Sequence, residues 1–176
     1  MAELSQIQIS FSDIEDRFLL RISTSNNEEF RFWLTRRFTS RLFPLMLETI
    51  QAIPDVASHN NTETRDAVMD FQREQAAEQA DFSSPFSSDK QKTVYPLGEQ
   101  AILVIRGTLS PESSNSFNLS LKGAQDVGID FSFSTEILYL LHKLLEDSLQ
   151  KTDWGLSFSS KSNALTHIDN TSRTLN

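Results

Sequence analysis

The side chains best suited to binding chemistry cluster early in the chain, at Arg31, Trp33, Arg36, Arg37 and Arg41. Arg36 and Arg37 fall in the first turn of an expected helix, where free backbone N–H groups already favour an anion. Arg37 and Arg41 are four residues apart and therefore share one flank of that helix. Guanidinium groups in such positions can hold a phosphate or a carboxylate through paired hydrogen bonds. The cluster predicts a small-anion site.

Two other interpretations of this cluster stay open. The arginines can instead form a solvated helix flank by pairing with nearby carboxylates, of which the sequence offers Glu28, Glu29 and Glu48. Trp33 lies on the outward face of its expected strand by alternation. A tryptophan in that position either anchors a protein interface or is covered by the protein's own central helix or linker.

The sequence carries no motif for catalysis, for a cofactor or for a metal. It has no Walker loop, no dinucleotide-binding glycine pattern, no nucleophile elbow and no zincin motif. The three histidines, His59, His142 and His167, are far apart, and there is no cysteine. We therefore expect no catalytic residues, no cofactor and no metal site, as in a protein that is not an enzyme.

Composition narrows the class of protein further. With 176 residues, 38% of them hydrophobic and 13 of them phenylalanine, the chain is long enough for one packed domain. Its formal net charge of −8 repels phosphate at long range, which argues against nucleic-acid binding. The apolar runs are too short to cross a membrane, and the first residues do not resemble a secretory signal. We expect a cytoplasmic protein without a membrane partner.

The elements that must position the arginine cluster follow from hydrophobic periodicity. Apolar residues alternate with polar ones over Ile7–Phe11, Phe18–Ile22 and Phe30–Leu34, which indicates three strands. From Thr35 the period becomes helical and continues to Ile50. The Thr35 hydroxyl is the expected N-cap of this helix.

The same order of elements occurs a second time. At a constant offset of 99 residues, Arg17–Gln51 aligns without a gap on Ser116–Gln150, so that Phe18 falls on Phe117 and Phe32 on Phe131. The second copy predicts three strands, over Ala101–Leu109, Phe117–Leu121 and Ile129–Phe133. A helix capped by Ser134 or Thr135 follows them and continues to about Gln150.

The two copies agree in their apolar positions and differ in charge. The positions of Arg31, Arg36, Arg37 and Arg41 are taken in the second copy by Asp130, Thr135, Glu136 and Leu140. Pairs of opposite charge, Arg31 with Glu136 or Arg37 with Asp130, could therefore align the two copies. The same pairs could form between two chains of a homodimer.

The structure of the remaining segments is predicted from their amino-acid composition and pattern. Ile53–Val56 and the stretch around Trp154, Leu156 and Phe158 are predicted to be weak strands. Thr64–Ala80 is predicted to be a polar helix and Asp81–Thr93 a linker whose Phe82 and Phe86 dock on the body. The polar stretch Lys161–Asn176 is predicted to be disordered.

Together these patterns predict an α+β fold. We expect a mainly antiparallel sheet built from two β-β-β-α pseudo-repeats, about residues 5–52 and 100–158, with the helices packed on one face. A third helix lies in the insert 53–94 between the repeats. Residues 1–160 form a single domain, and 161–176 are a disordered polar tail.

For function, the absent motifs, the acidic composition, the outward Trp33 and the charge contrast favour a non-enzymatic protein-binding module. A homodimeric accessory or assembly factor is one form of it. The alternative is a small-anion or metabolite-binding protein that uses the arginine cluster, and an enzyme with a dispersed site is the third hypothesis. The expected partner is a protein or a second copy of the chain, and neither nucleic acid nor a membrane is expected.

Overall fold

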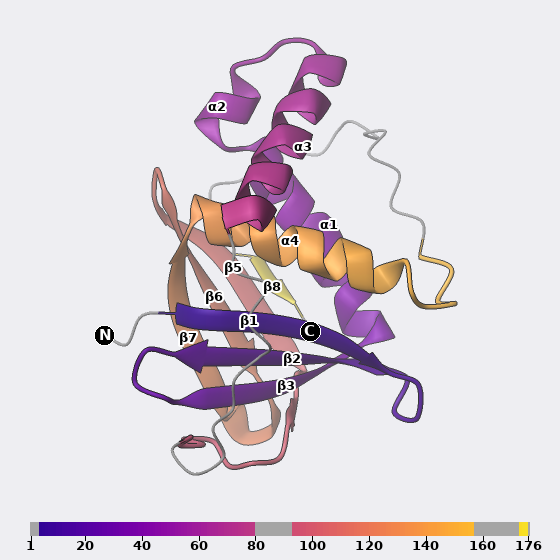
Figure 1. Cartoon of the computed structure of the whole chain (residues 1–176), viewed down its shortest axis with the longest axis vertical. Coiled ribbons are helices and arrows are strands. Elements are labelled where there is room, and N and C mark those ends of the chain that lie inside the picture. Colours follow the sequence, from indigo (N-terminus) through magenta and orange to yellow (C-terminus); the bar gives the residue numbers. More distant parts are fainter. Residues whose placement is uncertain (1–3, 80–92, 157–172, 176) are drawn as a thin grey trace.

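The computed structural model describes residues 4–79, 93–156 and 173–175. Within them the chain forms two mainly antiparallel sheets and four α-helices, which is the α+β class that the sequence predicts. The first sheet lies in front of the second in Figure 1, and its strands run across those behind. The predicted docking of Phe82 and Phe86, and the end of the predicted strand at Phe158, lie outside the described residues.

The first sheet contains the three strands predicted from the first copy. These are β1 (Leu4–Ser12), β2 (Arg17–Thr24) and β3 (Glu29–Thr35), which pair as antiparallel neighbours. A two-residue strand, β4 (Ile102–Leu103), pairs in parallel with β3 and completes the order β1-β2-β3-β4.

The second sheet has the order β7-β6-β5-β8. Its strands are β5 (Arg106–Ser113), β6 (Ser116–Lys122), β7 (Gly128–Ser134) and β8 (Arg173–Leu175). The sequence placed β8 in a disordered tail, whereas these three residues pair with β5. A short 3-10 turn (Ala124–Asp126) links β6 to β7.

The single strand predicted over Ala101–Leu109 is wrong, because the chain changes sheets in its middle. The Val104 N–H donates to the Trp33 carbonyl at 3.0 Å and holds the chain on the first sheet. The next residue, Ile105, donates its N–H to the Lys122 carbonyl at 2.9 Å and starts the second sheet. We call this segment, residues 102–106, the crossover.

Strand register follows the offset found in the sequence. Phe18 pairs with Leu34 in the first sheet and Phe117 with Phe133 in the second, so both partners move by 99 residues. The outer strands need a different offset, because Phe11 pairs with Phe18 but Pro111 pairs with Phe117, a shift of 100 for the outer residue. The first strand of each half therefore could not align at the common offset.

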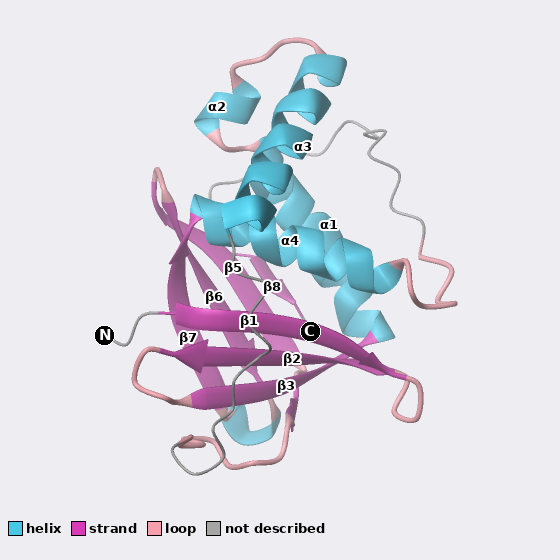
Figure 2. Ribbon diagram, in the orientation of Figure 1, coloured by secondary structure: helices cyan, strands magenta, loops and turns pink. Residues whose placement is uncertain are grey.

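Among the described residues, three helices lie between β3 and β4 along the chain and a fourth follows β7, and Figure 2 shows them together above the two sheets. They are α1 (Arg36–Gln51), α2 (Pro54–Ala57), α3 (Thr62–Gln79) and α4 (Thr135–Leu149). The predicted cap of α1 is present, since Thr35 Oγ1 accepts the Phe38 N–H at 3.1 Å. Ser134 makes no capping hydrogen bond at α4. The start of α4 is instead tied to the β5–β6 turn by Thr135 Oγ1, which donates to Asn115 Oδ1 at 2.6 Å.

Two weak strands predicted beside the helices are wrong. The stretch predicted around Ile53–Val56 is the short helix α2, which begins at Pro54 because proline fits the first position of a helix. Residues 151–156 after α4 form turns and bends rather than a strand.

Helices α1 and α4 each pack on both sheets. Helix α1 contacts β3, and it also contacts β5 and β8 of the second sheet. Helix α4 contacts β6 and β7, and it also contacts β1 of the first sheet. The contact of α1 with β5 is close, because a Cβ added at Gly107 would meet the ring of Phe38 at 2.8 Å. The two halves therefore share one hydrophobic core.

None of the described helices combines the length and the apolar character that a membrane crossing requires.

Candidate functional site

Arg31 is held inside the protein's own network. Its Nε donates to Glu29 Oε1 at 2.7 Å, and Arg21 Nε donates to the same oxygen at 2.8 Å. The remaining Arg31 nitrogens donate to the Glu99 carbonyl and to the Tyr95 hydroxyl, and the guanidinium lies 4.6 Å from the centre of the Tyr95 ring. Of the interpretations considered for the arginines, pairing with a nearby carboxylate is the one that the structure shows for Arg31.

The electrostatics of this network hold Glu29 ionised. Burial raises the pKa of Glu29, which is only 1% exposed, but hydrogen bonds from Arg21 and Arg31 outweigh it and leave the pKa below its ordinary value. The same hydrogen bond raises the pKa of Arg31. The charge of Arg31 is thus matched within the chain.

The other three arginines of the cluster are exposed on α1. Arg36, Arg37 and Arg41 form no ion pair with any carboxylate in the described residues. The charge pairs expected between the two copies are not formed. Arg31 binds Glu29, and Asp130 binds Lys122 of its own sheet.

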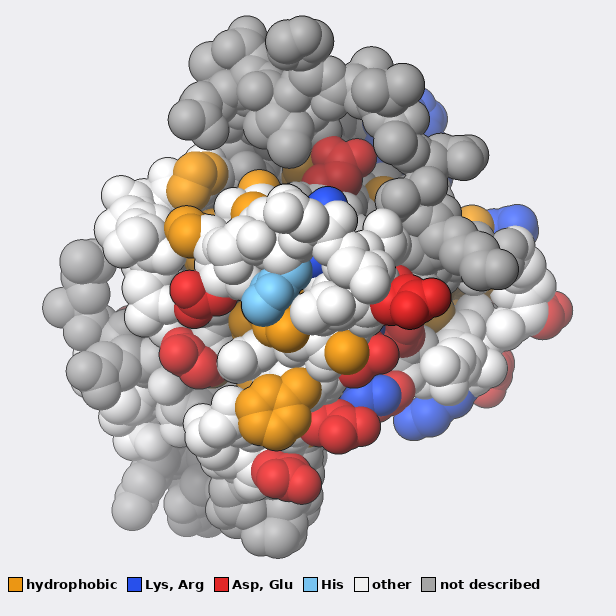
Figure 3. Space-filling view, turned by 90° about the horizontal axis from the view of Figure 1, so that it is seen from above, with side chains coloured by type: hydrophobic (Ala, Val, Ile, Leu, Met, Phe, Trp, Pro, Cys, Tyr) orange, Lys and Arg blue, Asp and Glu red, His pale blue; other side chains and the backbone are white. Residues whose placement is uncertain are grey.

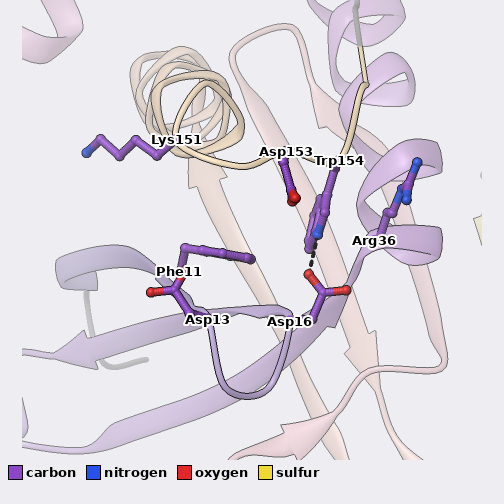
Figure 4. A pocket seen from close by; sticks show the side chains of 7 residues that line it. All are labelled: Phe11, Asp13, Asp16, Arg36, Lys151, Asp153 and Trp154. Carbon is purple, nitrogen blue, oxygen red and sulfur yellow. Dashed lines mark hydrogen bonds between the residues drawn. The ribbon is translucent and has the colours of Figure 1, made fainter.

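Arg36 lines an open pocket of about 570 Å³ between three segments of the chain (Figure 4). Asp13 and Asp16 belong to the turn between β1 and β2, and Arg36 is the first residue of α1. The third wall follows α4, and the full lining is Phe11, Asp13, Asp16, Arg36, Lys151, Asp153 and Trp154.

Trp154 is the lining residue of this pocket that is held most firmly by its neighbours. Its indole N–H donates to Asp16 Oδ1 at 2.5 Å, as Figure 4 shows. The ring centroid lies 5.6 Å from that of Phe11 and 4.7 Å from that of Phe18, so the side chain is 2% exposed. Asp16 has a φ of 48°, a conformation that Asp tolerates better than most residues. No local sequence pattern predicts this pair, because its members are 138 residues apart.

The charges around the pocket do not suit an anion. The carboxylates of Asp13, Asp16 and Asp153 outnumber the cations of Arg36 and Lys151. In Figure 4 the ammonium end of Lys151 points away from Trp154. No group of acidic or histidine side chains among the described residues could hold a metal ion.

A second buried polar cluster lies where α1, α3 and α4 meet. His142 stacks on Phe43 with ring centroids 4.2 Å apart, and neither ring nitrogen has a hydrogen-bond partner in the described part of the chain. Burial, with a smaller effect of Arg73, lowers the pKa of His142 to about 3. Arg73 of α3 pairs with Asp70 at 3.3 Å and with Glu146 at 3.7 Å. His142 is therefore a neutral core residue at physiological pH.

Seen from the side of α2 and α3, acidic side chains lie among hydrophobic ones on the surface (Figure 3). Helix α3 buries few of its side chains, which are Met69, Arg73 and Ala76, and leaves Phe71 62% exposed. This face offers isolated apolar side chains, which are normal on a protein surface.

Large aliphatic side chains gather instead at the crossover. Leu103 is 39%, Ile105 49% and Val127 43% exposed. Leu103 pairs in register with Trp33, which is half-buried, so both side chains leave the same face of the sheet. The backbone of Val127 is linked to that of Leu103 through Gly123. The Gly123 N–H donates to the Val127 carbonyl, and Gly123 also lies against the Leu103 carbonyl. We call Trp33, Leu103, Ile105 and Val127 the crossover surface.

The outer faces of the two sheets differ at matching positions. In the first sheet Leu19 pairs with Trp33, and 99 residues later Asn118 pairs with Ser132. Asn118 Nδ2 donates to Ser132 Oγ at 3.5 Å, and Ser132 Oγ donates to Glu112 Oε1 at 2.8 Å. At this position the second sheet therefore has a polar pair where the first has an apolar one.

No protein-family model, curated protein or solved structure matches the chain.

Proposed function

We propose that the protein is a non-enzymatic protein-binding module and that it binds its partner through the crossover surface. The observation that carries the proposal is the exposure of three large aliphatic side chains, Leu103, Ile105 and Val127, whose backbones lie close together beside Trp33. Gathered apolar side chains with an aromatic neighbour are the usual core of a protein interface. Full burial of an exposed aliphatic side chain contributes about 1.5–3 kcal/mol, and because these three are less than half exposed, each would contribute roughly half as much.

We also infer that the two halves are pseudo-repeats of one β-β-β-α unit. This inference is supported by the shared register of β2–β3 and β6–β7 and by the helix that follows each meander. The crossover lies where the two units join, so neither unit alone would carry this surface. That placement suits a partner that recognises the joined pair.

The proposal is tested by removing the aliphatic side chains of the crossover. The double variant Leu103→Ser and Ile105→Ser changes side chains that are exposed, so the fold should be kept. The matched control is Ile14→Ser, which removes a 96% exposed isoleucine from the turn between β1 and β2. Mass spectrometry quantifies the proteins that the wild type captures and compares them with the proteins that each variant captures.

We expect a partner that the wild type and Ile14→Ser retain and that the double variant loses by about tenfold or more, since tenfold corresponds to only 1.4 kcal/mol. Equal retention by all three proteins would contradict the proposal, and so would the absence of any specific partner of the wild type. Far-UV circular dichroism of each variant establishes that a loss of binding does not reflect unfolding.

A further inference from the structure

The outer edge of β7 carries backbone groups that pair with nothing in the described residues. In the order β7-β6-β5-β8, β7 is the terminal strand. The Gly123 N–H donates to the Val127 carbonyl at 2.8 Å, and the Thr135 N–H donates to the Asn115 carbonyl at 3.3 Å. Hydrogen-bonded pairs recur every second residue in an antiparallel ladder, so odd-numbered residues of β7 face β6. The outward N–H and C=O groups therefore belong to Gly128, Asp130, Ser132 and Ser134.

The matching edge in the first sheet shows what such groups bind. The Glu29 N–H donates to the Val94 carbonyl at 2.9 Å, and the Trp33 carbonyl accepts the Val104 N–H at 3.0 Å. These two residues of β3 correspond, at the offset of 99, to Gly128 and Ser132 of β7. Two short pieces of the chain, at Val94 and at residues 102–104, thus pair with the edge of β3, whereas the edge of β7 is open within the described part of the chain.

The edge of β7 lacks the features that usually prevent pairing. It is seven residues long, without proline and without a register shift against β6. Its one charged residue, Asp130, is paired with Lys122. Ile129 and Phe131 are only half-buried on its inner face, so further apolar surface is available beside the backbone groups.

We propose that this edge binds a second copy of the chain, with β7 antiparallel to β7 and the register centred on Phe131. This register joins the outward groups of Asp130 to those of Ser132 of the second copy. On the inner face it places Ile129 against the second copy's Phe133. A register centred on Asp130 would set two like charges directly opposite each other, which is unfavourable. The pairing turns two four-stranded sheets into one continuous sheet.

This inference deepens the proposed protein-binding function by naming one partner, and it rests on β7 rather than on the crossover surface. Two chains that each carry a net charge of −8 repel one another. Because salt screens this repulsion, the dimer becomes tighter as ionic strength rises.

The test is sedimentation velocity of the full chain over a range of roughly 1 to 100 μM, where weak dimers dissociate. Ser132→Pro removes an N–H that points away from β6, so it blocks the new edge and leaves the existing ladder intact. The control is Ser132→Ala, which loses the side-chain contacts with Glu112 and Asn118 but keeps the N–H. We expect wild type and Ser132→Ala to form dimers and Ser132→Pro to raise the dissociation constant at least tenfold.

Hydrogen exchange provides a second readout that needs no variant. The amides of Asp130 and Ser132 should exchange more slowly at high than at low protein concentration. A wild type that stays monomeric at the highest concentration, or a dimer that Ser132→Pro leaves unchanged, would overturn the inference. The double variant Leu103→Ser and Ile105→Ser should remain dimeric, so failure of this inference and failure of the proposed function can be told apart.

Discussion

The hydrogen bond between Trp154 and Asp16 joins two segments 138 residues apart at the edge of the core. Trp154 is 2% exposed, and Asp16 is the acceptor that the structure provides for its indole N–H. An unsatisfied buried donor costs about 1–3 kcal/mol. This bond therefore fixes both the turn between β1 and β2 and the segment after α4.

We predict that Asp16→Ala lowers the free energy of unfolding by about 1–3 kcal/mol, because Trp154 loses its acceptor and alanine is strained at a φ of 48°. Asp16→Asn keeps an oxygen acceptor and tolerates this conformation, so it should lose less than half as much. Urea unfolding followed by tryptophan fluorescence measures both values. Equal losses for the two variants would contradict the structural role of the bond.

His142 makes stability depend on pH. Its pKa in the folded protein is lowered to about 3, so the folded state keeps it neutral while the unfolded chain takes up a proton below its ordinary pKa of about 6.5. Because the pKa of His142 is depressed in the folded state, its contribution to the free energy of unfolding is fully present above pH ~6.5 and is lost as the pH falls toward about 3. The steepest loss is about 1.4 kcal/mol per pH unit.

We predict that His142→Leu removes this dependence. Leucine fills a similar volume and leaves no unpaired ring nitrogen, so the variant should be at least as stable as wild type at pH 7. From pH 6 to pH 4 the wild type should lose stability relative to the variant by about 1–3 kcal/mol. Urea titrations at each pH measure the difference, and a constant difference over this range would show that His142 is not buried as a neutral residue.

Residue roles were predictable from the sequence only where the partner is close along the chain. Thr35 caps α1 through a bond that spans three residues, and Arg31 pairs with Glu29 two residues away. The contact of Trp154 with Asp16 depends on how distant segments pack, and no local pattern reports it. For the same reason the sequence could not show that Arg36 lines a pocket with three carboxylates while Arg31 is enclosed.

At the scale of elements, the packing of α1 on β5 decides how the two halves fit. Gly107 of β5 lies under Phe38 of α1 so closely that a methyl group at this position would approach the ring to 2.8 Å. A side chain there would force the ring of Phe38 to shift. Glycine at this position therefore allows the close approach of the Phe38 ring to the strand.

We predict that Gly107→Ala destabilises the protein by about 1–3 kcal/mol, which is typical of overpacking in a core. Adding Phe38→Leu removes ring atoms at the contact, so the double variant should lose less than the sum of the two single changes. The four free energies of unfolding form a double-mutant cycle. Strict additivity would mean that α1 and β5 do not touch at this point.

Periodicity predicted the long elements well and the short ones poorly. Alternation over five-residue stretches located β1, β2, β3, β6 and β7, and the helical stripe located α1 and α4. The break at Val104 and Ile105 was hidden, because both residues continue an apolar run while their N–H groups bind different sheets. Pro54 is a local signal for a helix start that the sequence analysis did not use.

At the scale of the whole molecule, the sequence defined which face of each strand is buried but not what lies against it. The sequence left open whether the two halves form one sheet or two. Two sheets form, the chain passes from the first to the second at the crossover, and β4 pairs with one edge of the first. The placement of α1 and α4 over both sheets follows from contacts between residues distant in the sequence. Such contacts produce no periodic pattern of apolar residues in the sequence. The class of the fold was therefore predictable, and the arrangement of its layers was not.

The sharing of helices between the sheets sets the order in which the protein can fold as it is made. Helix α1 is complete at Gln51, yet β5, on which Phe38 packs, begins only at Arg106, and β8 lies at Arg173–Leu175. Contacts this distant along the chain form slowly. A growing chain that has not passed Arg106 therefore presents the part of α1 that packs on β5, including Phe38, without its cover. Transiently exposed apolar surface of this kind makes a folding chain prone to aggregation.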